Sequence, residues 1–131
     1  MKKTIVNIIL SFVLGLLLGA LAGLFLSQSN QKGASLGYVG MGHEQLKAKN
    51  YIKAIGYFNR AVALNPNSIV GRISLSDAYY TIGNYEMALE EYEITLELSN
   101  EEKLNEAEVR YIKRKIEDIK NQLNKDGNKG K

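Results

Sequence analysis

The chain repeats itself at a spacing of 34 residues. Three identities carry the repeat: Asn50-Tyr51 recurs as Asn84-Tyr85, Ala54 as Ala88 and Leu64 as Leu98. Similar residues recur at the same spacing, with Met41 and Leu75, Gly42 and Ser76, Ile55 and Leu89, and Phe58 and Tyr92. A unit of this length cannot bury an apolar face alone and must stack against a neighbour. We therefore expect residues 35–68 and 69–102 to form two copies of one structural unit.

Each copy is predicted to form two short helices joined by a tight turn. Apolar residues recur every three or four positions on both sides of Lys49-Asn50 and of Gly83-Asn84, as in amphipathic helices. Asn50 and Asn84 are expected to cap the second helix of each pair. Pro66 ends the first copy, and the S-x-x-E sequence Ser99–Glu102 is expected to end one helix and begin the next.

With these features the chain resembles the tetratricopeptide repeat family. The matching residues in the first copy are Met41-Gly42, Tyr51, Ala54, Phe58, Ala61 and Pro66; those in the second are Leu75, Tyr79, Gly83-Asn84-Tyr85, Ala88 and Tyr92. Tyr38 also fits the family pattern. The second copy departs from it at three positions, which are Arg72, Thr95 and Asn100.

Residues 103–124 continue as one amphipathic pattern, with apolar residues at Leu104, Val109, Ile112, Ile116, Ile119 and Leu123. The resemblance implies that this helix covers the open end of the stack, where a solenoid needs a polar outer face. Residues 125–131 are expected to be disordered. The predicted fold is all-α, with an N-terminal transmembrane helix, an α-solenoid of two helix-turn-helix units and a capping helix.

The N-terminal region, residues 1–26, is apolar after Met1-Lys2-Lys3 and carries no charge from Thr4 to Leu26. A helix over residues 5–26 would be roughly 33 Å long, enough for a hydrocarbon core of about 30 Å. The alternative is a signal peptide cleaved after the A-x-A sequence Ala20-Leu21-Ala22. We favour the uncleaved anchor, because the apolar run exceeds a usual signal core and continues beyond that site.

The basic N-terminus predicts a single-pass protein of the cell membrane, with the repeat domain outside the cytoplasm. Gly15, Gly19 and Gly23 share one helix face, which favours packing against another membrane helix or a second copy. The alternative is that glycine is simply common in membrane helices. Residues 27–34 are polar and are predicted to form a short flexible linker.

The sequence does not support catalysis or a cofactor. It has no Cys and a single His, His43, so it offers no thiolate or His-based metal site and no nucleophile triad. The glutamates between positions 86 and 97 are interpreted as a solvated helix face. The net charge is +3 over residues 35–68, −7 over 69–102 and +4 over 103–131. An acidic copy therefore interrupts any basic stripe, and nucleic-acid binding is not expected.

By the resemblance, the first helix of each unit lines a concave surface that binds extended peptides or partner helices. The expected lining is Leu36, Val39, His43, Leu46, Lys47, Val70, Ile73, Asp77, Tyr80 and Thr81, with Tyr111, Arg114 and Lys115 from the capping helix. His43 is expected to form a plain hydrogen bond, the alternative being a pH-sensitive contact. The basic cluster Lys113-Arg114-Lys115 is interpreted as a solvated face, the alternative being a patch for lipid or an acidic partner.

The sequence thus predicts a membrane-anchored protein that binds other proteins and has no activity of its own. The alternative is a permanent structural subunit of a larger membrane complex, held through the glycine face and the repeat domain. Two units and a cap lie near the lower size limit for a solenoid, so a docked partner would add stability.

Overall fold

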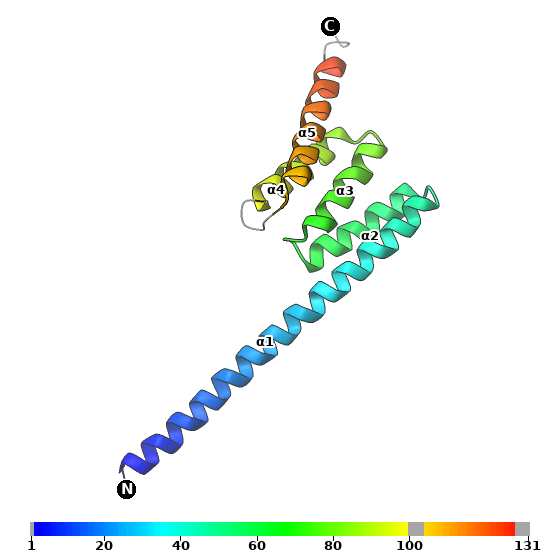
Figure 1. Ribbon diagram of the computed structural model, residues 1–131. Coiled ribbons are helices and arrows are strands. Elements are labelled where there is room, and N and C mark those ends of the chain that lie inside the picture. The colour runs from blue at the N-terminus through cyan, green and yellow to red at the C-terminus, as the bar shows by residue number, and fades with distance from the viewer. Residues whose placement is uncertain (1, 100–103, 128–131) are drawn as a thin grey trace. The chain divides into compact units, whose positions relative to one another are not determined.

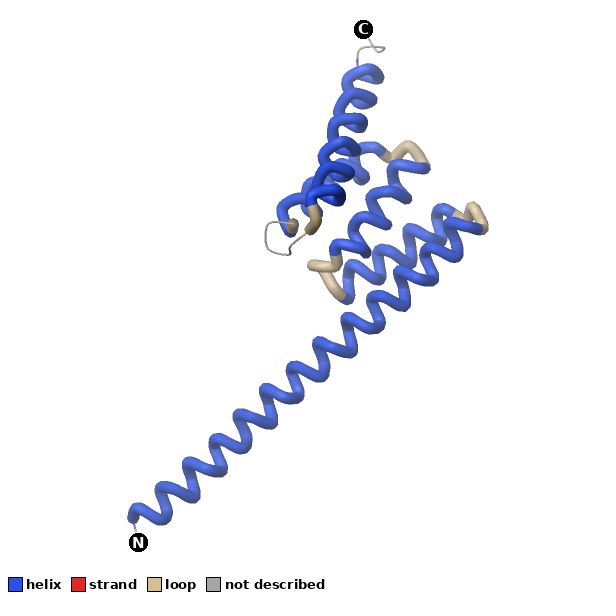
Figure 2. Tube along the Cα trace, in the orientation of Figure 1, coloured by secondary structure: helices blue, strands red, loops and turns tan. Residues whose placement is uncertain are grey.

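The computed structural model describes residues 2–99 and 104–127, with side chains for residues 10–99 and 104–125. The described residues form helices joined by short turns, as Figures 1 and 2 show. In chain order the helices are α1 (Lys2–Lys47), α2 (Tyr51–Leu64), α3 (Ile69–Thr81), α4 (Tyr85–Leu98) and α5 (Glu106–Gly127). The all-α prediction is confirmed.

The chain divides into two compact units, residues 1–33 and residues 34–131. The predicted flexible linker at residues 27–34 is helical and lies within α1, so that prediction of its local structure is wrong. The segment contains no proline and only one glycine, Gly33. Extending an existing helix through such residues adds one hydrogen bond per residue and needs no new nucleus.

The turns after α1 and α3 have the same geometry at positions 34 residues apart. The amide of Asn50 donates to the carbonyl of Gln45 at 2.8 Å, and the amide of Asn84 donates to that of Tyr79 at 3.0 Å. Each turn needs a left-handed residue, which is Lys49 in the first (φ 58°) and Gly83 in the second (φ 77°). Glycine adopts this conformation without a steric penalty, whereas Lys49 does not.

The predicted helix caps are only partly present. Asn84 caps α4, because its side-chain oxygen accepts from the amide of Met87 at 3.3 Å. Asn50 forms no such bond; its side-chain amide instead donates to the side-chain oxygen of Gln45 at 3.1 Å. The prediction for Asn50 is therefore wrong. Ser68, which the sequence prediction missed, caps α3 by accepting from the amide of Gly71 at 3.1 Å.

The last helix begins later than the sequence predicts. Residues 100–102 of the predicted capping box lie outside the described residues, and α5 begins at Glu106. A different box caps it. The amide of Glu108 donates to the Asn105 side chain at 3.0 Å, and the amide of Asn105 donates to the Glu108 carboxylate at 3.1 Å. The helix continues to Gly127, so residues 125–127, predicted to be disordered, are helical; residues 128–131 lie outside the described residues.

The second unit has two apolar clusters. The first joins α1, α2 and α3 through Val39, Ala54, Ile55, Phe58, Ala61, Leu75 and Ala78. The second joins α4 to α5 through Ala88, Tyr92, Ile112 and Ile119. Gly42 lets α1 approach α2 closely, since a Cβ there would collide with the ring of Phe58. The capping helix is therefore an integral part of the core.

Candidate functional site

Three helices form one continuous side of the second unit, which we call the first-helix face: α1 from residue 35 onward, α3 and α5. Side-chain contacts join them in sequence. His43 of α1 lies 3.2 Å from Ser74 of α3, measured between the ring Nε2 and the Ser hydroxyl. The hydroxyl of Tyr111 in α5 donates to the carboxylate of Asp77 in α3 at 2.6 Å. The helices that the resemblance assigns to one surface are therefore neighbours.

Asp77 is the centre of a polar cluster on this face. It accepts a hydrogen bond from Tyr111 and a second, short one from the hydroxyl of Tyr92 in α4. The ammonium group of Lys115 lies over the ring of Tyr80, 4.0 Å from its centroid, and 5.8 Å from that of Tyr111. A cation at this distance from an aromatic face is attracted to it. These contacts hold α5 against α3.

The environment of the cluster shifts two tyrosine pKa values. Burial, together with the hydrogen bond to Asp77 and its negative charge, raises the pKa of Tyr92 well above its usual value of 10.0. The same causes, with burial again the largest, raise the pKa of Tyr111 to about 12. Both hydroxyls therefore remain protonated donors near neutral pH, which suits a structural role better than acid–base chemistry.

The predicted lining residues fall into two groups. Leu36 and Val70 expose 59% and 54% of their surface, and His43, Lys47, Thr81, Tyr111 and Arg114 are also exposed. The half-buried residues are Leu46, Ile73, Asp77, Tyr80 and Lys115. Val39 does not fit the prediction, because it is 5% exposed and packs in the first apolar cluster. It contributes to the core and cannot line an open surface.

An ion pair joins α3 to α4 where the sequence departs from the family pattern. The guanidinium of Arg72 lies 2.6 Å from the carboxylate of Glu91, and it also donates to the carbonyl of Pro66 at 2.7 Å. The two charged side chains are only 12% and 15% exposed. Glu91 is therefore not part of the solvated face predicted for the glutamates of this region. The opposite charges in a 19-residue separation were the only sequence signal for this pair.

Two hollows lie on the second helices of the units. One follows α2 and is lined by Lys53, Gly56, Tyr57 and Arg60. The other lies between α4 and α5, with Glu86, Leu89, Glu90, Glu93, Ile94, Glu97 and Leu123 as its lining. The first is basic and aromatic, whereas the second has apolar residues bordered by carboxylates. Among the residues with described side chains, no group of three or more His, Asp or Glu could hold a metal ion.

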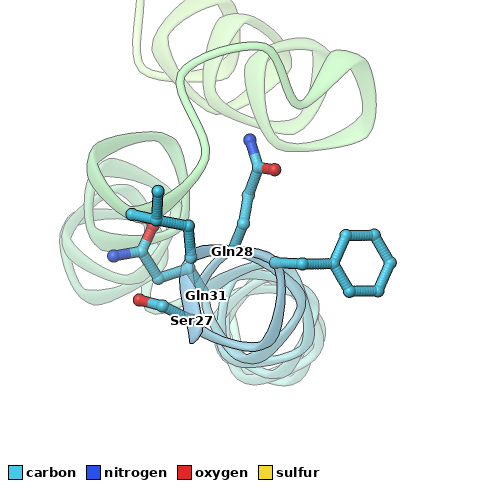
Figure 3. Close-up of a pocket in the computed structure, with 5 residues that line it drawn as sticks. Ser27, Gln28 and Gln31 are labelled. Atoms are coloured by element: carbon cyan, nitrogen blue, oxygen red, sulfur yellow. The ribbon is translucent and has the colours of Figure 1, made fainter. Parts of the chain in front are cut away.

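The first unit is described separately. By length and composition, α1 is the one described helix that could cross a membrane. A Cβ added at Gly15, Gly19 or Gly23 would meet nothing within 4 Å, so this helix face is open. Beyond the apolar stretch lies a polar one; Figure 3 shows Ser27, Gln28 and Gln31 projecting from α1, where they line a hollow with Leu24 and Phe25.

Solved structures with the same helical arrangement decide the fold. The complex of the TPR2B domain of yeast Sti1 with pHsp70 is 22% identical, with a TM-score of 0.63 over 68% of this chain and 70% of that one. The chain has the tetratricopeptide repeat fold. Two structures of a tetratricopeptide repeat domain from Salinibacter ruber agree: a crystal structure at 17% identity (TM-score 0.60, 66% and 96% coverage) and an NMR structure at 18% (0.59, 65% and 85%). No protein-family model and no curated protein sequence matches the chain.

Proposed function

We propose that this tetratricopeptide repeat protein is a non-catalytic, membrane-anchored module that binds other proteins on its first-helix face. The observation that carries the proposal is the continuity of this face, with exposed apolar side chains at Leu36 and Val70 beside the aromatic Tyr111. Buried apolar and aromatic anchors usually supply most of the energy of a protein interface. In this fold the first helices line the concave side, which suits an extended peptide or a helix.

The charges of the face also favour a peptide or helix with apolar anchors. Asp77 already accepts hydrogen bonds from two tyrosines, and Lys115 already lies over Tyr80. Neither charge is free to bind a ligand without breaking contacts that hold α5 in place. The yeast Sti1 domain with the same fold was solved in a complex with pHsp70, which supports protein binding by such a face.

Membrane anchoring is supported by the surface of the first unit. Between Leu10 and Leu26, eleven large apolar side chains expose 46–73% of their surface. Fully covering one such side chain is worth about 1.5–3 kcal/mol, so water is an unfavourable environment for this helix. A lipid bilayer covers it along its whole length. The basic N-terminus favours a cytoplasmic start and display of the repeat domain on the other side.

Anchoring and orientation have separate tests. The intact mass of the protein extracted from membranes should equal that of the uncleaved chain, whereas loss of residues 1–22 would identify a signal peptide. For orientation, Asn67→Cys provides the only thiol in a chain without cysteine. A membrane-impermeant maleimide should label it in intact cells. Labelling only after cell lysis would place the repeat domain in the cytoplasm and contradict the proposal.

Partner binding is tested with paired variants of opposite faces. Ile73→Ser with Tyr80→Ala alters the first-helix face, whereas Glu90→Lys with Glu93→Lys alters the outer surface of α4. We expect only the first pair to lose the partner. Because Ile73 and Tyr80 are half-buried, Val70→Ser serves as a second variant at an exposed position. Each protein is first shown to be folded by circular dichroism. Loss of the partner only after charge reversal would make α4 the docking surface.

The open glycine face of α1 favours a second candidate function, a permanent subunit of a membrane complex. Purification in a mild detergent separates the two. A subunit would keep stoichiometric partners through a high-salt wash. An adaptor would release its ligand and exchange it with added peptide.

A further inference from the structure

The second helices of the two repeat units carry surfaces of opposite charge. On α2, Lys53 and Arg60 border a hollow of about 320 Å³ that also contains Gly56 and Tyr57; we call these four residues the basic strip. On α4, Glu86, Glu90, Glu93 and Glu97 border the hollow against α5, of about 390 Å³; we call these four residues the acidic ridge. Both helices have 14 residues.

The charges on the two helices have matching spacing. Lys53 and Arg60 are seven residues apart, which is about 10.5 Å along a helix. On the acidic ridge, Glu86 and Glu93 are also seven apart, as are Glu90 and Glu97. A basic strip laid along an acidic ridge can therefore place both cations opposite carboxylates. The two alternative carboxylate pairs allow this in either of two registers.

Most of these charges have no partner within the described part of one molecule. Glu93 pairs with Lys120 of α5 at 2.8 Å, but no ion pair with a described residue involves Glu86, Glu90, Glu97 or Lys53. Arg60 lies 5.9 Å from the ring centroid of Tyr38 and faces no carboxylate. The glutamates also repel one another, because like charges three or four residues apart on a helix are destabilising. A cationic surface placed against them relieves this repulsion.

Apolar surface accompanies the charges on both sides. Leu89, Ile94 and Leu123 are half-buried in the hollow between α4 and α5. On α2, Tyr57 is half-buried, and a Cβ at Gly56 would meet nothing within 4 Å, so the strip has room for a side chain from another molecule. Because exposed ion pairs contribute little on their own, covering these apolar side chains must supply much of the binding energy.

The two surfaces cannot meet within one molecule. α3 packs against both α2 and α4, whereas α2 and α4 are not in contact. We propose that the acidic ridge of one copy docks on the basic strip of a second copy. Such a contact joins two different surfaces, so each added copy leaves one basic strip and one acidic ridge free. The repeat domains therefore form head-to-tail chains, independently of the ligand on the first-helix face.

Sedimentation velocity of the full chain in a mild detergent tests this proposal. We expect the sedimentation coefficient to rise with protein concentration at 50 mM NaCl and this rise to weaken at 500 mM NaCl, where surface charges are screened. The measurement is repeated with Gly19→Leu, which separates this contact from pairing of α1. A single species at all concentrations and low salt would overturn the proposal.

Charge reversal provides the specific test. We expect Lys53→Glu with Arg60→Glu, or Glu90→Lys with Glu97→Lys, to weaken self-association at least tenfold. Mixing the two variants, or combining all four substitutions in one chain, should restore it, because the charges are again complementary. Lys113→Glu with Lys125→Glu, and Glu106→Lys with Glu117→Lys, are matched controls at exposed positions of α5. If these controls weaken association equally, or if the combined variant is not restored, the contact does not exist.

Discussion

The hydroxyl of Tyr92 marks the main chemical difference between the cores of the two repeat units. Its equivalent in the first unit, 34 residues earlier, is Phe58, which packs edge-on against His43 at a centroid distance of 5.3 Å. The equivalent of His43 in the second unit is Asp77, and it accepts the Tyr92 hydroxyl. A ring without a donor thus faces an aromatic partner, whereas a ring with a donor faces a carboxylate.

A second pair of equivalent positions follows the same rule. Tyr38 and Tyr57 stack in the first unit, with ring centroids 6.3 Å apart. In the second unit these positions hold Arg72 and Glu91, which form the largely buried ion pair. Breaking one partner of such a pair leaves an uncompensated charge, so the two positions change together. The sequence showed Arg72 only as a departure from a pattern; its partner became evident from the fold.

The shifted tyrosines make stability depend on alkaline pH. Both tyrosines have a pKa of about 10 in the unfolded chain, and that of Tyr111 rises to about 12 in the fold. Below pH 10 both states are protonated and the contribution is complete. Between pH 10 and 12 the unfolded chain loses protons that the folded chain keeps, so the free energy of unfolding falls.

Tyr92→Phe tests this dependence. We expect it to lower the free energy of unfolding at pH 8 by about 1.5–3 kcal/mol, because Asp77 loses one of its two donors. It should also reduce the decline above pH 10. Urea denaturation at pH 8, 9.5 and 10.5 measures both effects. Tyr57→Phe is the control, since its hydroxyl has no hydrogen bond with the described residues. Equal losses in the two variants would show that the bond to Asp77 contributes nothing.

Gly42 should be essential to the packing of α1 on α2. We expect Gly42→Ala to lower the free energy of unfolding by about 1–3 kcal/mol, because the added methyl group displaces Phe58 in a filled core. Gly40→Ala, two residues away in the same helix, meets nothing within 4 Å and should raise stability by roughly 0.5–1 kcal/mol. Thermal or urea denaturation measures both. A stabilised Gly42→Ala protein would show that the two helices can separate freely.

At the scale of the elements, helix number and type follow from apolar spacing, but the helix ends do not. Asn50 and Asn84 occupy equivalent positions, and only Asn84 caps its helix because the Asn50 side chain is held by Gln45. The helical state of residues 27–34 was missed for a different reason. Polar composition indicates exposure, whereas the local structure there depends on an adjacent helix that is already formed.

The caps can be compared directly. Ser68→Ala should lower the free energy of unfolding by about 1 kcal/mol, because the first turn of α3 loses the acceptor for the amide of Gly71. Asn50→Ala should cost only a few tenths of a kcal/mol, the typical effect of a surface substitution. Urea denaturation of the two variants provides the comparison. A larger loss for Asn50→Ala would mean that this residue caps α2 in solution.

The membrane helix should associate through its glycine face. We expect Gly19→Leu to weaken association of α1 in the bilayer, because a large side chain prevents close approach of a second helix. Leu17→Phe enlarges a residue on the opposite face and is the matched control. Chemical crosslinking in native membranes reports the change. An unaltered oligomer or complex profile for Gly19→Leu would show that the glycines do not form a contact.

At the scale of the whole molecule, the repeat, the cap and the apolar helix could all be predicted from periodicity and composition. The first-helix face could be predicted only in part. Spacing placed Val39 on the same side of its helix as Leu36, but the depth of a side chain depends on how closely Gly42 lets α2 approach. Likewise, the convergence of Tyr92 and Tyr111 on Asp77 requires three helices and has no local sequence signal.

Site-specific photocrosslinking in native membranes tests the central claim, that partners bind the first-helix face. A photoreactive amino acid is placed at Val70 on this face or at Glu90 on the acidic ridge, both exposed positions. The account predicts a discrete adduct with another protein from Val70, and from Glu90 only adducts between copies of this chain. A discrete adduct with another protein from Glu90 and none from Val70 would contradict it.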